Sequence, residues 1–465
     1  MTIACRQNIW RFSVRACDLD GKNIVIWGTG KEGRAAASFL LRRLRNPKIV
    51  FADEDEGPSE EEGFHVVREP GTIADAFEKA DAVIKSPGVS LYHPLVEKTK
   101  NRGTLVTSLL NLWLAEPHTT KVICVTGTKG KSTTASLIAH ALKAFGEKVA
   151  LAGNIGVPVT DIVETEADFA IVEVSSYQAA DMERECDLGI LVSLYPEHLD
   201  WHRSLDAYFR DKINLLRHSR VKVINAETVR EIDERLVREA IAFNDRKGLH
   251  AGKGSIYSGE MRIGIVANSY LARPHNLSNV CAALTALEQL GFDVKKALRN
   301  MEDFRGLPHR QQELGEKDGV LYVDDSISTT PQSAVAAMDI YFDRPVTLIA
   351  GGFDRGIDYA PLVDSIIKRE INAVICMGPS GERIASFLKK AGFDRVFLAD
   401  SMKEAVDISR RKTPPGGVVL LSPAAPSYGL FRDFTERGKA FASASGFGKN
   451  ESEEGSGKDN PANAG

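Results

Sequence analysis

Short apolar runs alternate with helical patterns through the first part of the chain. Residues 23–27 (NIVIW), 48–52 (KIVFA) and 82–85 have the length and composition of buried strands. Residues 34–45 carry alanine and leucine at helical spacing, and the acidic, turn-rich stretch 54–63 is typical of a solvated loop. Strands that alternate with helices predict a parallel sheet covered on both faces.

The same alternation occurs twice more. After a predicted linker at Glu116-Pro117-His118 come strands, a helix that starts at Ser132 and a buried helix at 277–290; the predicted strands are 121–126, 169–174 and 188–194. After a second break at 304–308, further strands are predicted at 320–323, 346–350, 373–377 and 418–421. We therefore predict three α/β domains at 1–116, 117–305 and 306–445. The last residues, 446–465, are rich in Gly, Ser, Asn and Glu and are predicted to be disordered.

Composition narrows the class of protein. Of 465 residues, 43% are hydrophobic and 26% are charged, which excludes global disorder. The formal net charge is −4, from 59 basic and 63 acidic residues, so a dedicated nucleic-acid or membrane-surface binder is not expected. No apolar run has the length of a membrane span, the N-terminus has no signal-peptide pattern, and the six cysteines are scattered. We expect a cytoplasmic protein with reduced thiols.

The strongest local motif is a glycine turn between an apolar strand and a helix. It reads Thr126-Gly127-Thr128-Lys129-Gly130-Lys131-Ser132-Thr133. Glycines let the backbone N–H groups point at phosphate oxygens, and the following helix adds its positive end. Lys131 is expected to reach the β- and γ-phosphates, and Ser132 to bind Mg²⁺. Val125 stands where the usual phosphate loop has a further glycine. We favour a shortened phosphate loop over an ordinary glycine-rich turn.

A second glycine motif lies near the N-terminus. Gly28-Thr29-Gly30-Lys31-Glu32-Gly33 follows a strand and opens a helix, and Asp53 comes 20 residues after Gly33. This is the G-x-G-x-x-G pattern of dinucleotide sites. The same turn holds any diphosphate, so it does not choose between NAD and a UDP-sugar. A tight turn without a ligand explains the pattern equally well.

Carboxylates follow several strands. Glu173 ends one and is well placed for Mg²⁺ if the phosphate loop is near. His198 and His202 form an H-x-x-x-H pair, but no third ligand is evident and we do not expect zinc. Three pairs in the last third read singly as caps and turns, and together as a site for an anionic substrate: His309-Arg310, Asp324-Asp325 and Asp354-Arg355.

Taken together, the motifs resemble those of the Mur ligases and occur in the same order. The resemblance covers residues 28–438 and rests on 126–133, 153–156, 173–178, 198–202, 275–279, 307–310, 325–326 and 421–423. The G-x-G-x-x-G turn, Ser175-Ser176-Tyr177-Gln178 and LSPAAPSY, with Phe434 and Arg437-Gly438 behind it, are most similar to the glutamate-adding branch. The resemblance implies a Rossmann-like N-terminal domain, a central P-loop ATPase-type domain and a Rossmann-like C-terminal domain.

The resemblance also implies a reaction. ATP would phosphorylate the terminal carboxylate of UDP-N-acetylmuramoyl-L-alanine, and the amine of glutamate would displace phosphate from the acyl phosphate, in peptidoglycan precursor synthesis. D-glutamate is the favoured amino acid, and L-glutamate is the alternative. ATP and two Mg²⁺ ions are implied, and so is a CO₂-derived carbamate on Lys212. The implied partners are the two substrates and no nucleic acid or membrane, and a monomer is expected.

Each implied role falls on residues of this chain. Lys131, Glu173, His198 and Lys212 would be catalytic, and Ser132, Glu173, His198 and carbamylated Lys212 would hold metal. ATP would be bound by Gly127, Thr128, Lys129, Gly130, Lys131, Ser132, Thr133, Asn276, Arg310 and Asp325. The UDP-sugar would be bound by Gly28, Thr29, Gly30, Lys31, Ser86, Pro87, Gly88 and Asn154. Glutamate would be bound by Thr329, Arg355, Ser427 and Phe434.

The chain departs from the family pattern in the last domain. Ile327 replaces a lysine, and Arg355 stands where the glutamate-binding lysine is usual. Arginine holds a carboxylate through two parallel donors, which lysine does not. Recognition of an acidic amino acid is therefore retained, while its configuration stays open.

Three other classes are weaker. An oxidoreductase, suggested by the first glycine turn and Asp53, leaves the phosphate loop and the last domain unexplained. A folate-type polyglutamate ligase starts directly at its ATP domain, whereas an α/β unit precedes Lys121 here. A non-catalytic nucleotide-binding regulator does not need the full set of Lys131, Glu173, His198 and Lys212.

Overall fold

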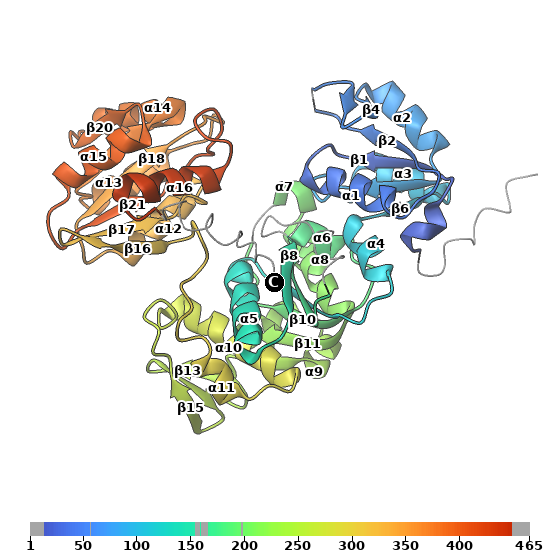
Figure 1. Cartoon of the computed structure of the whole chain (residues 1–465), viewed down its shortest axis with the longest axis horizontal. Helices are drawn as coiled ribbons and strands as arrows, with labels where there is room; N and C mark the ends of the chain where they lie inside the picture. The colour runs from blue at the N-terminus through green and yellow to red at the C-terminus, as the bar shows by residue number, and fades with distance from the viewer. Residues whose placement is uncertain (1–13, 56, 154–158, 160–165, 197–198, 449–465) are drawn as a thin grey trace, which may run out of the picture. The chain divides into compact units, whose positions relative to one another are not determined.

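The computed structural model describes residues 14–55, 57–153, 159, 166–196 and 199–448. The chain folds into two compact units, Met1–Phe304 and Arg305–Gly465. Both units are built on parallel-rich sheets with helices on their faces, as the sequence predicts (Figure 1). Among the described residues, no helix is long and apolar enough to cross a membrane.

The first sheet has the order β3-β4-β2-β1-β5-β6 and is parallel except where β3 meets β4. Its strands are β1 (Asn23–Trp27), β2 (Lys48–Ala52), β3 (Glu60–Glu61), β4 (Phe64–Val67), β5 (Ala82–Lys85) and β6 (Leu105–Thr107). Its helices are η1 (Ala16–Leu19), α1 (Lys31–Leu41), α2 (Pro70–Lys79), α3 (Pro94–Asn101) and α4 (Leu109–Ala115). The predicted bounds of β1, β2 and β5 are confirmed.

Two local predictions about this sheet were wrong. The helix predicted at 34–45 begins at Lys31 and ends at Leu41, because Gly30 is its extended N-cap residue. The stretch 54–63, predicted as a loop, contains the short edge strand β3. A strand of two exposed or half-exposed glutamates has no apolar pattern by which the sequence could show it.

The second sheet is entirely parallel and has the order β12-β11-β10-β7-β9-β8. Its strands are β7 (Lys121–Thr126), β8 (Val149–Gly153), β9 (Phe169–Glu173), β10 (Cys186–Leu191), β11 (Ser219–Asn225) and β12 (Ile241–Phe243). The accompanying helices are α5 (Lys131–Phe145), α6 (Ser176–Ala180), α7 (Leu199–His202), α8 (Leu205–Arg217), η3 (Ala226–Glu231), α9 (Glu234–Glu239), α10 (Pro274–Gln289) and α11 (Val294–Arg299). Helices α5 and α10 pack side by side (Figure 1).

The predicted strand at 188–194 is shifted in the structure. β10 ends at Leu191, and the chain then turns so that Ser193 and Tyr195 contact the phosphate loop. An antiparallel sheet of β13 (Leu249–Gly252), β14 (Ser255–Ser258) and β15 (Met261–Ile265) was not predicted. These strands are short and mostly half-exposed, so their sequences lack a continuous apolar run.

The two six-stranded sheets of the Met1–Phe304 unit share a continuous apolar core. One buried cluster includes Ile24 and Ile26 of β1, Leu110 and Trp113 of α4, and Val172 of β9. A buried ion pair, Lys85 Nζ to Asp181 Oδ2 at 2.7 Å, also links them. The predicted division at 116/117 therefore falls where the chain passes from one packed layer to the next, and it stays a prediction.

The sheet of the Arg305–Gly465 unit has the order β16-β17-β21-β18-β19-β20, with β16 antiparallel to β17. Its strands are β16 (Gln312–Lys317), β17 (Val320–Asp324), β18 (Val346–Gly351), β19 (Ala373–Met377), β20 (Val396–Ala399) and β21 (Val418–Leu421). Its helices are α12 (Pro331–Ile340), α13 (Ala360–Lys368), α14 (Gly378–Lys390), α15 (Met402–Lys412) and α16 (Phe434–Ser445).

The predicted disordered tail starts too early in the sequence. Gly446 is the left-handed C-cap residue of α16, and the ring of Phe447 lies 5.6 Å from that of Tyr322. Residues 446–448 thus belong to the fold, because Phe447 packs on the sheet. Residues 449–465 lie outside the described part of the chain.

Candidate functional site

The phosphate loop lies at the carboxyl end of β7, the strand next to β9 and β10 in the second sheet. Gly130 has φ +84° and is the N-cap residue of α5, and a Cβ there would lie 2.3 Å from Asn279 Oδ1. Only glycine fits both the left-handed backbone and this close approach. The loop therefore leads directly into the N-terminus of a 15-residue helix, the geometry that binds phosphate.

Two lysines meet at one carbonyl of this loop. Lys131 Nζ donates to the carbonyl oxygens of Gly127 at 2.9 Å and Thr128 at 3.1 Å. Lys212 Nζ, from α8, donates to the same Gly127 oxygen at 3.0 Å, and its side chain is 2% exposed. The predicted phosphate lysine and the predicted carbamate lysine are therefore neighbours, although 81 residues of sequence separate them.

The loop is held by side chains that were not predicted from the sequence. Thr128 Oγ1 lies 2.8 Å from the hydroxyl of Tyr208 and accepts from the backbone N–H of Tyr195 at 2.9 Å. Ser193 Oγ accepts from Lys129 N and donates to Lys129 O, both at 2.9 Å. Only the fold brings the β10 end to the loop, so local sequence carried no signal for these contacts.

The residues at this edge fit a magnesium–nucleotide ligand. Glu173 ends β9 and is 2% exposed, and Ser132 in the first turn of α5 is 5% exposed. A carboxylate and a hydroxyl beside a phosphate loop are the oxygen donors that Mg²⁺ takes. Among the described residues there is no group of three His, Cys, Asp or Glu side chains with metal-site geometry. The predicted ligand His198 lies outside the described residues.

Asn276, which is predicted to bind ATP, lies in the first turn of helix α10. Its side chain is 1% exposed and accepts from Asn279 Nδ2 at 3.2 Å, and Asn279 Oδ1 lies 3.4 Å from Thr134 Oγ1 in α5. Asn276 is therefore connected to the phosphate-loop helix. Its predicted contact with the nucleotide stays a prediction.

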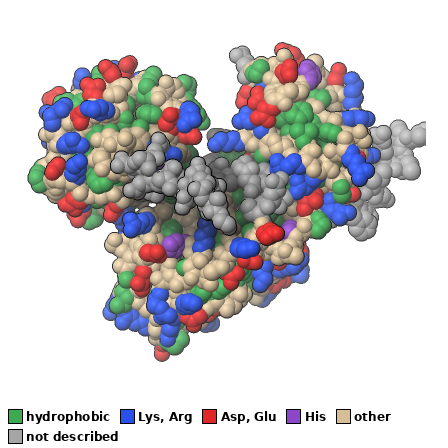
Figure 2. Space-filling view, viewed as in Figure 1, with side chains coloured by type: hydrophobic (Ala, Val, Ile, Leu, Met, Phe, Trp, Pro, Cys, Tyr) green, Lys and Arg blue, Asp and Glu red, His purple; other side chains and the backbone are tan. Residues whose placement is uncertain are grey.

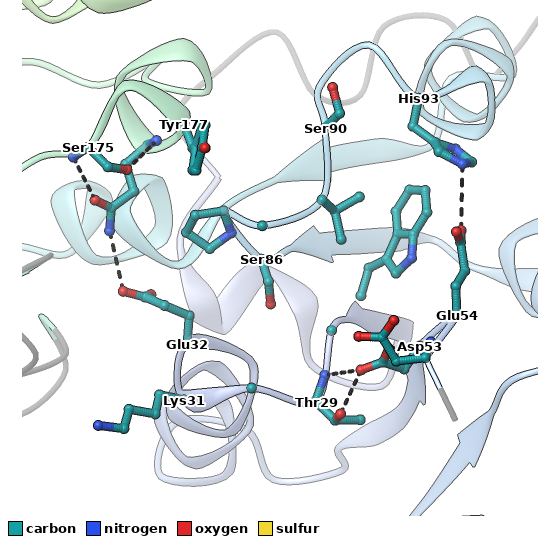
Figure 3. Close-up of a pocket in the computed structure, with 18 residues that line it drawn as sticks. Thr29, Lys31, Glu32, Asp53, Glu54, Ser86, Ser90, His93, Ser175 and Tyr177 are labelled. Atoms are coloured by element: carbon teal, nitrogen blue, oxygen red, sulfur yellow. Dashed lines mark hydrogen bonds and ion pairs between the residues drawn. The ribbon is translucent and has the colours of Figure 1, made fainter. Parts of the chain in front are cut away.

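A cavity of about 620 Å³ opens between the first and second sheets (Figure 3). Its lining comes from the ends of β1, β2 and β5 and from the start of α6, and includes the predicted residues Gly28, Thr29, Gly30, Lys31, Ser86, Pro87 and Gly88. Further lining residues were not predicted from the sequence: Trp27, Glu54, Asp55, Val89, Ser90, His93, Ser175, Tyr177 and Gln178. Cavities of this size hold nucleotide-sized ligands. Asn154 lies outside the described residues.

Among the described residues, some polar atoms that line the cavity have hydrogen-bond partners and others do not. Asp53 Oδ2 accepts from the backbone N–H of Thr29 at 2.7 Å and from its hydroxyl at 2.6 Å (Figure 3). Burial raises the pKa of Asp53, but these bonds outweigh it and the net pKa is lowered. Ser86 Oγ, by contrast, is buried with no hydrogen-bond partner in the described part of the chain. This hydroxyl beside the N-terminus of α1 suits the oxygen of a phosphate-bearing ligand.

Where α1 meets α6, the cavity wall carries a carboxyl group with a raised pKa, that of Glu32. Glu32 Oε1 accepts from Gln178 Nε2 at 3.3 Å, which joins α1 to α6 (Figure 3). Burial raises the pKa of Glu32. Gln178 also forms a capping box with Ser175 at the start of α6, in which its Oε1 accepts from Ser175 N at 3.0 Å, so its side chain is held from both ends.

The Arg305–Gly465 unit has its own polar cluster at the carboxyl ends of β17, β21 and β18. Asp325 is 2% exposed and accepts from Ser422 Oγ at 2.7 Å and from Gln311 N at 3.1 Å. Burial raises the pKa of Asp325 to about 6, against these hydrogen bonds and the charge of Arg310. Arg310 Nε is buried without a hydrogen-bond partner in the described residues. These are the predicted nucleotide residues of this unit.

Three of the predicted glutamate residues, Thr329, Arg355 and Ser427, lie on loops of the same edge, and Phe434 is the first residue of α16. Arg355 Nη2 donates to Thr329 O at 3.1 Å, so these two meet, and Ser427 is buried beyond β21. Ile327 occupies the loop after Asp325, and its N–H donates to His309 O at 3.1 Å. Ser326 Oγ donates to the carbonyl of Phe434 at 2.7 Å, which fixes the start of α16 beside that loop.

Arg437 ties the loops together, a role that was not predicted from the sequence. Its guanidinium is buried and donates to Ser326 Oγ at 3.0 Å, to Ser326 O at 2.8 Å and to Ala425 O at 3.0 Å. Burial lowers the pKa of Arg437 to about 10, which leaves the group charged at neutral pH. Gly438 beside it has no room for a Cβ, which would lie 2.0 Å from His309 Nδ1.

Charge on the surface is mixed. Figure 2 shows basic and acidic side chains interspersed over the visible face of both units. This agrees with the small net charge of −4. Surface charge therefore does not mark the candidate sites, which are recognised instead by their buried polar groups and glycine turns.

The fold and these sites define a class: an α/β protein whose central sheet carries a phosphate loop at its carboxyl edge and whose first sheet contributes to a cavity. Family descriptions match along the chain: "Mur ligase MurD-like, N-terminal domain" over 22–108, "Mur ligase middle domain" over 125–287 and "Mur ligase, glutamate ligase domain" over 309–425. The chain belongs to the Mur ligase family, and it is an ATP-dependent ligase that forms an amide bond.

Relatives agree over nearly the whole length. A UDP-N-acetylmuramoyl-L-alanine–L-glutamate ligase from a Micromonospora species is 39% identical over 450 residues, 93% of this chain and 98% of the relative. A protein of the same name from Xanthomonas euvesicatoria is 37% identical over 93% of this chain and 97% of its own. Among solved structures, the UDP-N-acetylmuramate-alanine ligase of Thermotoga maritima aligns with a TM-score of 0.55 at 18% identity, over 91% of this chain and 98% of its own. That structural likeness shows the shared fold.

The buried Asp325 carboxyl should make stability depend on pH. Its pKa is about 6 in the folded protein against 3.8 normally, so the folded state holds a proton that the unfolded state has lost between these values. Stability from this group is present below about pH 4 and is lost as the pH rises through 6. Relative to Asp325→Asn, wild type should lose about 2 kcal/mol of unfolding free energy between pH 4 and 7.

Urea denaturation of both proteins at several pH values measures this difference. Ser422→Ala, which removes one hydrogen bond but keeps the carboxyl, should retain the pH dependence. A wild type and an Asp325→Asn variant with parallel pH profiles would contradict the assignment.

Proposed function

We propose that this ligase joins glutamate to the carboxylate of UDP-N-acetylmuramoyl-L-alanine with cleavage of ATP to ADP and phosphate. The observation that carries the proposal is the meeting of the phosphate loop, Lys131, Lys212 and Glu173 at one edge of the second sheet, in the same unit as the 620 Å³ cavity. The names of relatives that match 93% of this chain support these substrates.

The configuration of the glutamate is a separate question. The sequence motifs favoured D-glutamate, with L-glutamate as the alternative. The relatives that match this chain at 36–39% identity are named for L-glutamate, which supports the alternative. Arg355 and Ile327, the two departures from the common pattern, lie on the loops where the amino acid is expected. We therefore propose L-glutamate as the substrate.

The chain's own groups account for the steps of the reaction. Ser86 and the N-terminus of α1 are proposed to hold the diphosphate of the sugar nucleotide. The backbone amides of the phosphate loop, together with Lys131, are proposed to hold the phosphates of ATP. Ser132 and Glu173 would hold Mg²⁺, which neutralises charge on the transferred phosphoryl group when bound. Phosphorylation turns the substrate carboxylate into an acyl phosphate with phosphate as its leaving group, which the glutamate amine can displace.

We propose that Asn154 and His198 contact substrate and the second metal, that Asn276, Arg310 and Asp325 bind the nucleotide, and that Lys212 is carbamylated. Support for the last role comes from the burial of Lys212 next to the phosphate loop. A cytoplasmic monomer stays a prediction from the sequence.

The deciding assay follows phosphate release and product mass with ATP, UDP-N-acetylmuramoyl-L-alanine and either glutamate enantiomer. We expect turnover with L-glutamate and much slower turnover with D-glutamate. Lys131→Ala is the matched inactive control, with a loss on the order of a hundredfold or more. A clear preference for D-glutamate would restore the first expectation. No phosphate release with either enantiomer would reject the proposed substrates.

Lys212→Ala should be nearly inactive, and excess bicarbonate should not restore it. Short carboxylic acids should partly restore turnover, because the proposed active group is an anion and the truncation leaves space for one. Lys212→Arg should also be inactive, since a guanidinium does not form the carbamate. Lys222, half-buried on β11 in the same unit, offers the control Lys222→Ala, which should keep full activity. Normal turnover by Lys212→Arg would contradict the carbamate.

Arg355→Ala should raise the Michaelis constant for glutamate by roughly tenfold or more, because a charge-assisted pair with the substrate carboxylate is lost. The Michaelis constant for ATP should change little. The Michaelis constant of Arg355→Lys for glutamate should lie between those of wild type and Arg355→Ala, since a single donor replaces a planar pair of donors. Arg383, which pairs with Asp354 nearby, gives the control Arg383→Lys. An unchanged glutamate constant in Arg355→Ala would remove Arg355 from the amino-acid site.

A further inference from the structure

Four polar side chains form a continuous hydrogen-bonded relay between the first and second sheets. The hydroxyl of Tyr92 donates to Asp211, whose two carboxylate oxygens both lie 2.8 Å away. Asp211 Oδ2 lies 2.7 Å from His202 Nδ1, and His202 Nε2 lies 3.0 Å from Ser176 Oγ. The relay is defined as Tyr92, Asp211, His202 and Ser176.

Each member is attached to a segment with a role in the proposed reaction. Tyr92 lies in the stretch 86–93, which contributes Ser86 and Ser90 to the cavity wall. Asp211 is the neighbour of Lys212 on α8. Ser176 begins α6, three residues after Glu173. The relay therefore connects the sugar-nucleotide cavity to α8, which carries Lys212, and to α6, which follows Glu173 at the end of β9.

The burial of three relay members increases the energetic importance of their hydrogen bonds. His202 is 0% exposed, Ser176 3% and Asp211 6%. In such surroundings a polar group without a partner costs free energy, and a completed network specifies one arrangement. The carboxylate of Asp211 only accepts, so we assign the His202 proton to Nδ1, which leaves Nε2 to accept from the Ser176 hydroxyl. Burial raises the pKa of Tyr92, so its hydroxyl stays the donor.

Neighbouring contacts fix the same segment but leave Tyr92 as the polar bridge to Asp211. Ser90 Oγ donates to Trp201 O at 3.0 Å, and Trp201 Nε1 donates to Gly88 O at 3.2 Å. The ring of Trp201 also stacks on Tyr177 of the cavity wall, with centroids 4.6 Å apart. Arg203 also donates to the backbone carbonyl of Tyr92. Stretch 86–93 thus lies against α7, and the Tyr92 hydroxyl joins it to α8 through Asp211.

We propose that Tyr92, Asp211 and His202 are positioning residues that hold the cavity stretch 86–93 in register with α6 and α8, and so place the bound sugar nucleotide relative to Glu173 and Lys212. The substrate in this statement rests on the proposed function. The relay itself rests on the hydrogen bonds across the two sheets. A well-satisfied histidine that only stabilises the core would affect folding without changing the affinity for one substrate.

Tyr92→Phe is the sharpest test, because it removes one oxygen and keeps the ring. We expect kcat/KM for the sugar nucleotide to fall roughly tenfold through a higher KM, since a hydrogen bond to a charged group is lost. KM for ATP should stay within twofold. A purely structural role would lower the active fraction, and hence kcat, without raising KM. Tyr257→Phe, a hydroxyl removal on β14 of the same unit, is the matched control.

His202→Gln tests whether the members act as a unit. It should show the same selective rise in KM, and the double variant with Tyr92→Phe should be less than threefold worse than the worse single variant. His140→Gln, which alters a surface histidine–aspartate pair with Asp303 at 2.8 Å, is its control. Losses that multiply fully, or a KM for the sugar nucleotide within twofold of wild type in Tyr92→Phe, would overturn the proposal.

Hydrogen–deuterium exchange gives a readout that does not need the reaction. In Tyr92→Phe, amides of 86–96 and of 199–212 should both exchange faster than in wild type, although they belong to different sheets, and Tyr257→Phe should change neither. If wild type failed to ligate glutamate, the proposed function would be rejected and this comparison would still decide the relay. Unchanged exchange in both segments would overturn it.

Discussion

Every candidate site in this protein depends on one constraint, the parallel direction of its strands. In a parallel sheet all strands end at the same edge, so the loops that follow them meet there. The turn after β1, the phosphate loop after β7 and the loop after β17 are each at such an edge. Glycine at positions such as Gly130 then lets the backbone itself face a ligand, because a Cβ would collide with a neighbouring side chain.

At the carboxyl edge of the second sheet, two lysine ammonium groups donate to a backbone carbonyl of the phosphate loop. Lys131 and Lys212 both donate to Gly127 O, and Glu173 is buried at the end of the adjacent strand. Buried charges of this kind are retained when they serve chemistry, since burying them costs stability. This arrangement agrees with an enzyme that handles the phosphates of ATP, and it explains why the two lysines occupy fixed positions although they lie on different helices.

Attachment of the first sheet to the second is the other physical requirement. Lys85 and Asp181 form a buried pair, and burial lowers the pKa of the lysine and raises that of the aspartate, while their mutual attraction opposes both shifts. Such a pair contributes little net stability, but separating its members would leave a buried charge without compensation. Together with the Tyr92 relay and the shared apolar core, it keeps the cavity beside the sheet edge that carries the phosphate loop.

Much of this protein could be predicted from its sequence, because strands, glycine turns and the Lys131-Ser132 pair are local features with their own periodicity and chemistry. The bounds of β1, β2 and β7 follow directly from apolar runs. The contacts of Tyr208 with Thr128, of Arg437 with two loops, and of Tyr92 with Asp211 could not be predicted in this way. Their partners lie 80, 111 and 119 residues apart, and nothing in a local pattern records which distant loops share a sheet edge. Those pairings were decided by tertiary structure, since only packed sheets bring such side chains within hydrogen-bond distance and remove the water that would otherwise satisfy them.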